Sequence, residues 1–111
     1  MADRRRSIDH FLPLSAPLLH TLLALADGDK HGYAIIKEIL RRTDGEVRLS
    51  AGTLYTLLRR ALADGLIVES DERRRYYRLA PLGRRVVQAE VARLEAVVEM
   101  ARMKNLWPKR A

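Results

Sequence analysis

The chain has 111 residues, enough for one modest domain, and its 48% hydrophobic content excludes general disorder. No apolar run reaches membrane-spanning length, and the absence of cysteine excludes a disulfide framework or a thiolate metal site and is compatible with a reducing cytoplasm. The net charge of +7 and a pI near 10.4 favour an anionic partner, which could be nucleic acid, an acidic protein or an anionic membrane surface.

Residues 1–13 form a basic N-terminal arm that contains Arg4, Arg5 and Arg6. The basic start is followed by Pro13 and Pro17 and not by a continuous apolar core, so no secretory signal is expected. Such an arm could follow a phosphate backbone or enter a minor groove. The alternative is a disordered solubilising tail.

The first helix is predicted from Leu14 to Ala26, opened by Ser15, with Pro17 tolerated in its first turn. Leucines lie on most of its sides, which predicts a central helix covered from several directions. We expect His20 to lie at the edge of the core.

A second helix is predicted over residues 31–43. Its buried stripe is apolar and its outer face basic, and Gly32 near its start indicates close packing against a neighbour. We expect Tyr33 to be half-buried. The turn pair Asp44-Gly45 then precedes an alternating segment over residues 46–49, which predicts a short strand. The expected buried residues are Ile35, Ile36, Ile39 and Leu40, and those facing out are Lys37, Arg41 and Arg42.

The segment from Leu49 to Ile67 predicts an amphipathic helix capped by Ser50 and ended by a left-handed Gly65. An outer face with few large side chains, one Tyr and one Arg suits a DNA major groove. An ordinary amphipathic helix with solvated arginines is the alternative. The predicted buried stripe is Leu54, Leu57, Leu58, Ala61 and Leu62; the outer face is Gly52, Tyr55, Thr56, Arg59 and Ala63.

Two strands joined by a polar turn are predicted between residues 66 and 79. We assign Tyr77 and Leu79 to the core, which leaves Tyr76, Arg78 and the turn residues Arg73, Arg74 and Arg75 outside, where they can meet phosphates. The alternative is a charged tip that keeps the hairpin edge from aggregating. The predicted order helix, helix, strand, helix, hairpin is that of a winged helix-turn-helix over residues 14–80, in a mainly α chain with a small β-hairpin (α+β).

A long helix is predicted over residues 81–107, roughly 35–40 Å in length, followed by a basic tail at 108–111. The rest of the domain is too small to cover the whole apolar stripe of this helix, and we therefore expect part of the helix to pack on a second copy of the chain. The alternative is that the helix packs wholly onto its own domain. The heptad seam is Val87, Val91, Leu94, Val98 and Ala101, and the flanking line is Val86, Val97, Met100 and Trp107.

Three segments together resemble the PadR family of bacterial transcriptional regulators: HGYAIIKEIL, LSAGTLYTLLRRALADGLI and RRRYYRLAPLGRRVV. The resemblance covers about residues 14–87 and implies a homodimer of winged-helix domains joined mainly by the C-terminal helix and the N-terminal region. It further implies a repressor whose DNA affinity changes when a small, often aromatic or hydrophobic effector binds. The short form with a single C-terminal helix is the one it resembles.

By position, Gly52, Thr53, Leu54 and Tyr55 match the start of the family's recognition helix, and residues 73–75 match its wing. Thr56 departs from a common proline, and Ala61-Leu62 from a usual Leu-acidic pair. Two recognition helices would enter successive major grooves about 34–36 Å apart and read a pseudo-palindrome. The candidate base-contacting residues are Thr53, Tyr55, Thr56 and Arg59, with Arg59 able to grip guanine; Arg73, Arg74, Arg75 and Arg78 are candidates for phosphates.

Met100, Met103 and Trp107 form a candidate effector pocket near the dimer seam, with interface core as the alternative. A second class of function is a protein–protein module that presents its basic face to an acidic partner. His10, His20 and His31 lack metal-ligand spacing and no glycine-rich phosphate loop follows a strand, so we expect no enzyme, metal or cofactor. The expected location is the bacterial cytoplasm, on the nucleoid when DNA is bound.

Overall fold

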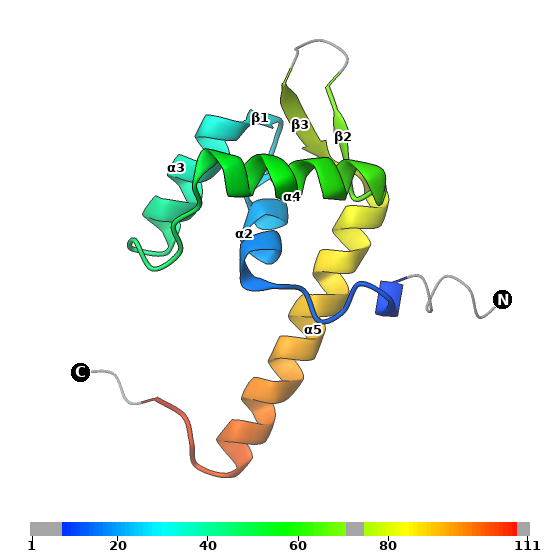
Figure 1. Cartoon of the computed structure of the whole chain (residues 1–111). Helices are drawn as coiled ribbons and strands as arrows, with labels where there is room; N and C mark the ends of the chain where they lie inside the picture. The colour runs from blue at the N-terminus through cyan, green and yellow to red at the C-terminus, as the bar shows by residue number, and fades with distance from the viewer. Residues whose placement is uncertain (1–7, 71–74, 109–111) are drawn as a thin grey trace, which may run out of the picture.

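The computed structural model describes residues 8–70 and 75–108, and its helices pack beside a small antiparallel sheet that lies at one end of the molecule (Figure 1). The sheet has three strands in the order β1-β3-β2, which confirms the predicted α+β class. The elements in chain order are α2 (Ala16–Ala24), β1 (Lys30–His31), α3 (Gly32–Arg42), α4 (Ala51–Ala63), β2 (Ile67–Glu69), β3 (Tyr76–Leu79) and α5 (Pro81–Met103).

Side-chain caps fix where the three shorter helices begin. The hydroxyl of Ser15 accepts from the Leu18 amide at 3.3 Å, and that of Ser50 accepts from the Thr53 amide at 3.1 Å. Both caps were predicted from the sequence, and both are confirmed. Serine is favoured at these positions because its oxygen satisfies an amide that has no partner within the helix. Gly65 ends the segment after α4 with φ of +77°, also as predicted.

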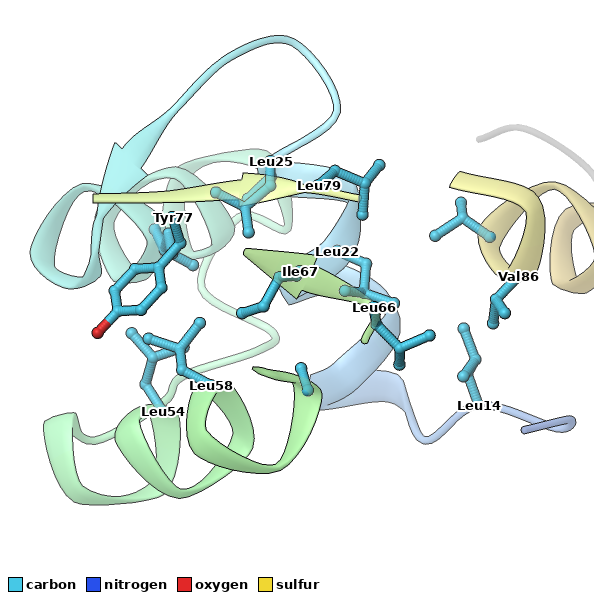
Figure 2. Packing of buried hydrophobic residues seen from close by; sticks show 14 of the residues in the cluster. Leu14, Leu22, Leu25, Leu54, Leu58, Leu66, Ile67, Tyr77, Leu79 and Val86 are labelled. Carbon is cyan, nitrogen blue, oxygen red and sulfur yellow. The ribbon is translucent and has the colours of Figure 1, made fainter. Parts of the chain in front are cut away.

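The core lies between α4, the sheet, α2 and the start of α5 (Figure 2). Leu54 and Leu58 extend from α4 toward Tyr77 and Ile67, and all four are at most 7% exposed. Tyr77 and Leu79 therefore face the core, as the alternation in β3 predicted. Of the predicted α3 stripe, Ile35 and Ile39 are buried, while Ile36 and Leu40 are half-buried; on α4, Leu57 and Leu62 are likewise half-buried.

The third strand is not where the sequence predicted it. Residues 46–49 are irregular, and the edge of the sheet is formed by β1, where Lys30 pairs with Tyr77 and His31 with Tyr76. Val47 and Leu49 produced the alternating pattern because both pack half-buried against the core from a loop. The observed order is therefore helix, strand, helix, helix, hairpin.

The first half of α5 belongs to the core, and the second half leaves it. Gly83 lies so close to Leu66, the residue before β2, that a Cβ there would be 2.0 Å from the Leu66 carbonyl oxygen. Val86 and Val87 are buried, whereas every residue from 91 to 100 is exposed, and α5 runs away from the body (Figure 1). The alternative that α5 packs wholly on its own domain is wrong. Val87, expected in the dimer seam, is 7% exposed and belongs to the core of its own chain.

The long helix ends at Met103 and not at Trp107. Asn105 adopts the left-handed conformation with φ of +60°, the Leu106 amide donates to the Ala101 carbonyl at 2.8 Å, and the Asn105 amide donates to Arg102 at 3.0 Å. These two bonds satisfy carbonyls of the last turn and stop the helix, and asparagine tolerates the required φ.

In the part of the chain that the structure describes, none of the helices combines the length and the hydrophobicity that a membrane span requires.

Candidate functional site

The outward face of α4 carries small and polar side chains. Gly52, Thr53, Thr56 and Arg59 are all exposed, as predicted. The Thr56 hydroxyl donates to the Gly52 carbonyl at 3.0 Å, so its oxygen can still accept a hydrogen bond. Arg59 makes no hydrogen bond or ion pair with any residue that the structure describes, so its five N–H donors are available to a ligand.

The Tyr55 side chain on α4 packs partly against the start of α3. Its side chain is only partly exposed at 38%, and its hydroxyl oxygen lies 2.9 Å from where a Cβ on Gly32 would be. The ring therefore occupies space that only glycine at the start of α3 leaves open. This confirms the close packing predicted for Gly32, and it joins the start of α3 to the outward face of α4.

The start of α3 adds aromatic and basic groups that the sequence argument left out. Tyr33 is 65% exposed, so the expectation of a half-buried ring is wrong. His31 stacks parallel to it with centroids 6.5 Å apart, and the Lys37 amino group lies 5.4 Å from the Tyr33 centroid. The sequence did contain a signal for this exposed pair, because residues 33 and 37 are four apart and lie on the side of the helix opposite the buried Ile35 and Ile39.

The hairpin beside α4 is described up to both sides of its tip. Arg73 and Arg74 lie outside the described residues, as do Arg4 to Arg6. Arg75 is exposed with φ of +64°, and its amide donates to the Glu69 carboxylate at 3.2 Å. That bond closes the base of the turn and leaves the Arg75 side chain outside.

Arg78 is exposed but engaged within the protein. Its Nε and Nη2 atoms donate to the two carboxylate oxygens of Asp29 at 3.0 and 3.1 Å. The hydrogen bonds from Arg78 lower the pKa of Asp29. This two-bond pair ties β3 to the turn before β1. The Asp29 carboxylate thereby neutralises the positive charge of Arg78, which the sequence argument assigned to binding DNA phosphates.

The exposed half of α5 is apolar along one side. Val91, Leu94 and Val98 are 38–40% exposed at successive seam positions, and Ala101 is half-buried. Met100 and Met103 are more exposed, and Trp107 lies beyond the helix with the Arg102 guanidinium 4.1 Å from its ring centroid. An exposed apolar stripe is thus present from Val91 onward, and its role as a dimer seam stays a prediction.

The histidines do not assemble into a site. His31 caps α3, with its Nδ1 atom accepting from the Ala34 amide at 3.2 Å. Among residues 8–70 and 75–108, no group of three or more His, Asp or Glu side chains is placed to hold a metal ion.

An exposed helix set on two others, followed by a hairpin at its side, defines a winged helix-turn-helix protein. Residues 21–89 match the transcriptional regulator PadR-like family, and the chain belongs to this family. It is therefore a transcriptional regulator of PadR type, and members of this family are regulators, not enzymes.

Individual proteins agree with this assignment. The chain is 39% identical over 94 residues to transcriptional regulator Rv3488 of Mycobacterium tuberculosis, which covers 79% of this chain and 81% of the relative. A transcriptional regulator from Clostridium thermocellum superposes with a TM-score of 0.67 at 28% identity, over 78% of this chain and 87% of that one. Pex from Synechococcus superposes with a TM-score of 0.52 at 25% identity, over 82% and 97%.

Proposed function

We propose that the protein is a homodimeric repressor that binds a pseudo-palindromic operator in double-stranded DNA in the bacterial cytoplasm. The observation that carries the proposal is the exposed face of α4, where Arg59 lacks a protein partner within the described chain, in a protein of net charge +7. A bare guanidinium between small side chains suits the O6 and N7 acceptors of guanine.

Contacts on this surface divide into two kinds. Thr53, Thr56 and Arg59, with the backbone approach that Gly52 permits, read base edges. Arg73, Arg74 and Arg75 of the wing hold phosphates, which fixes register without reading sequence. Tyr33 and Lys37 extend the phosphate-binding side, because α3 begins beside Tyr55. Arg78 supports the wing through Asp29 in the free protein and is a weaker candidate than the sequence suggested.

The dimer forms through the exposed half of α5. Val91, Leu94 and Val98 repeat at heptad spacing, and so contiguous an apolar face is a typical interaction site. In this division residues 14–80 bind DNA and residues 81–107 dimerise, while Arg4, Arg5 and Arg6 of the N-terminal arm add charge for phosphates. Two-fold symmetry then places the two α4 helices in successive major grooves.

A small hydrophobic or aromatic effector is part of the proposal. Met100, Met103 and Trp107 present exposed apolar and aromatic surface at the end of α5, beside the seam. An effector acts only if it binds one arrangement of the two protomers better than the other. The shift in the free energy of DNA binding cannot exceed that difference in the free energy of effector binding.

The test is fluorescence anisotropy with DNA from just upstream of the protein's own gene, against scrambled DNA of equal length, at several salt concentrations. The proposal expects tighter binding to the upstream DNA, one dimer per site, and affinity that falls steeply with salt. Equal, weak binding to both DNAs would contradict it and direct attention to an acidic protein partner of the basic face.

A further inference from the structure

A buried carboxylate lies where α5 leaves the body. Glu90 is 1% exposed, and its Oε2 atom accepts from the backbone amide of Leu14 at 3.3 Å. The Arg93 guanidinium binds the same carboxylate through two bonds, Nε to Oε1 at 2.7 Å and Nη2 to Oε2 at 3.0 Å. Neither the α4 surface nor the apolar seam uses this group.

Such a group is costly to bury and is rarely found without partners. Glu90 is the last buried residue of α5 before the exposed run that starts at Val91. Leu14 lies immediately before Ser15, the cap of α2, and the chain preceding α2 crosses α5 near its middle (Figure 1). The carboxylate therefore connects α5 to the segment that leads into the DNA-binding body.

We propose that Glu90 is a positioning residue that fixes the direction in which α5 leaves the body and, through the dimer, the separation of the two α4 helices. The contacts act from two sides: Leu14 holds the carboxylate to the body, and Arg93 holds it from the next turn of α5. The consequence for DNA rests on the proposed function, whereas the direction of α5 is a property of each protomer.

The part of α5 beyond Glu90 is long enough for a small change in its direction to produce a large displacement. Residues 91–103 extend about 20 Å beyond Glu90 at 1.5 Å per residue. A tilt of about 10° at Glu90 would move the far end of a helix of that length by about 3 Å. One base pair is about 3.4 Å, so a displacement of this size is large enough to matter for half-site spacing.

Distances between spin labels test the inference directly. The chain has no cysteine, so Ala63→Cys on α4 and Glu99→Cys on α5, both at exposed positions, can be labelled without side reactions. Labelled protein diluted with an excess of unlabelled protein reports the distance within one protomer. It does so whether or not the chain dimerises.

Glu90→Gln should shift or broaden the Ala63–Glu99 distance by about 2 Å, because Glu99 lies about 13 Å beyond Glu90 at 1.5 Å per residue and the tilt is about 10°. Arg93→Gln should do the same, and Arg93→Lys, which keeps the charge but not the two-bond geometry, should give a smaller change. The matched controls are Arg85→Gln on the exposed side of α5 and Glu46→Gln in an exposed loop. Folded variants with wild-type distances would overturn the inference.

Operator spacing gives the second readout. Binding is measured to upstream DNA whose central spacer is lengthened or shortened by one base pair. The wild type should favour one spacing, while Glu90→Gln and Arg93→Lys should discriminate less; equal discrimination by all three would contradict the inference. Failure of the wild type to bind any DNA would sink the proposed function, and the label distances would still decide the role of Glu90.

Discussion

The Tyr55 hydroxyl oxygen lies 2.9 Å from the position that a Cβ would occupy on Gly32, with Leu54 3.4 Å from the same point. The absence of one methyl group on α3 thus sets the orientation of an aromatic ring on α4. Since Tyr55 lies beside the small residues proposed to read bases, the packing of α3 and the shape of the DNA-facing surface are coupled.

The first prediction is that Gly32→Ala weakens operator binding while the protein stays folded. The added methyl must displace the far end of Tyr55, while alanine's better helix propensity offsets part of that cost, so we expect about 1 kcal/mol of destabilisation or less. Operator affinity should fall about fivefold, or roughly 1 kcal/mol. Urea unfolding and anisotropy measure the two effects.

The control for the unfolding measurement is Gly52→Ala, where a Cβ would meet nothing within 4 Å. Its stability should stay the same or rise by up to about 1 kcal/mol. Unchanged operator binding by Gly32→Ala would show that Tyr55 can move without consequence for the DNA surface.

The second prediction concerns Gly83, where the obstacle is backbone. A Cβ there would lie 2.0 Å from the carbonyl oxygen of Leu66, which already accepts from the Ala80 amide at 2.9 Å. Neither group can rotate away, so Gly83→Ala should destabilise the protein by about 3 kcal/mol or more. A thermal midpoint equal to that of Gly52→Ala would disprove the close approach of α5 to the backbone of Leu66.

The third prediction separates base reading from phosphate binding. Arg59→Ala should weaken binding to the operator by roughly 1–3 kcal/mol with little effect on scrambled DNA. Arg75→Ala should weaken both DNAs alike and reduce the salt slope by about one unit. Anisotropy at several salt concentrations distinguishes them, with Arg85→Ala on α5 as the control. Equal losses on both DNAs for Arg59→Ala would move Arg59 to the phosphate group.

The fourth prediction is that Leu94→Asp produces monomers. Leu94 is 38% exposed in the middle of the apolar seam, and paired charges across a two-fold axis would repel in an apolar contact. Sedimentation velocity measures the result. Leu23→Asp, at a 41% exposed leucine on α2, should leave the dimer intact. A dimer that survives Leu94→Asp must be joined elsewhere.

The fifth prediction is a pH dependence that Glu90 produces. The hydrogen bonds from Arg93 lower the pKa of Glu90 from its ordinary value of 4.5, and the Leu14 amide contributes in the same direction. Because the folded-state pKa is lowered, the stability it contributes is fully present above pH 4.5 and is lost as the pH falls through the folded value.

Urea unfolding at pH 6 and pH 3 tests this. The free energy of unfolding of Glu90→Gln should lie below that of the wild type at pH 6 and approach it at pH 3. Asp27 and Asp29 also have lowered pKa values, so the wild type and the variant should both lose stability in acid. Parallel pH profiles for wild type and variant would show that Glu90 contributes no such dependence.

Local signals in the sequence were sufficient for most helices, their caps and the family. Ser15, Ser50 and Gly65 act on backbone groups within a few residues of themselves, so their effect can be read from the adjacent letters. The stripe through Leu54, Leu58 and Ala61 likewise needs only the period of a helix. The outward face of α4 follows from its buried one.

Only the tertiary structure decided which groups meet across the chain. Lys30 and His31 form a strand because β3 offers a free edge to pair with. A strand of two residues is too short to produce a periodic pattern in the sequence. Val87 continues the heptad pattern of Val91 and Leu94 but is buried because α5 starts against β2. Glu90 meets Leu14 across 76 residues, and so distant a contact leaves no local pattern in the letters.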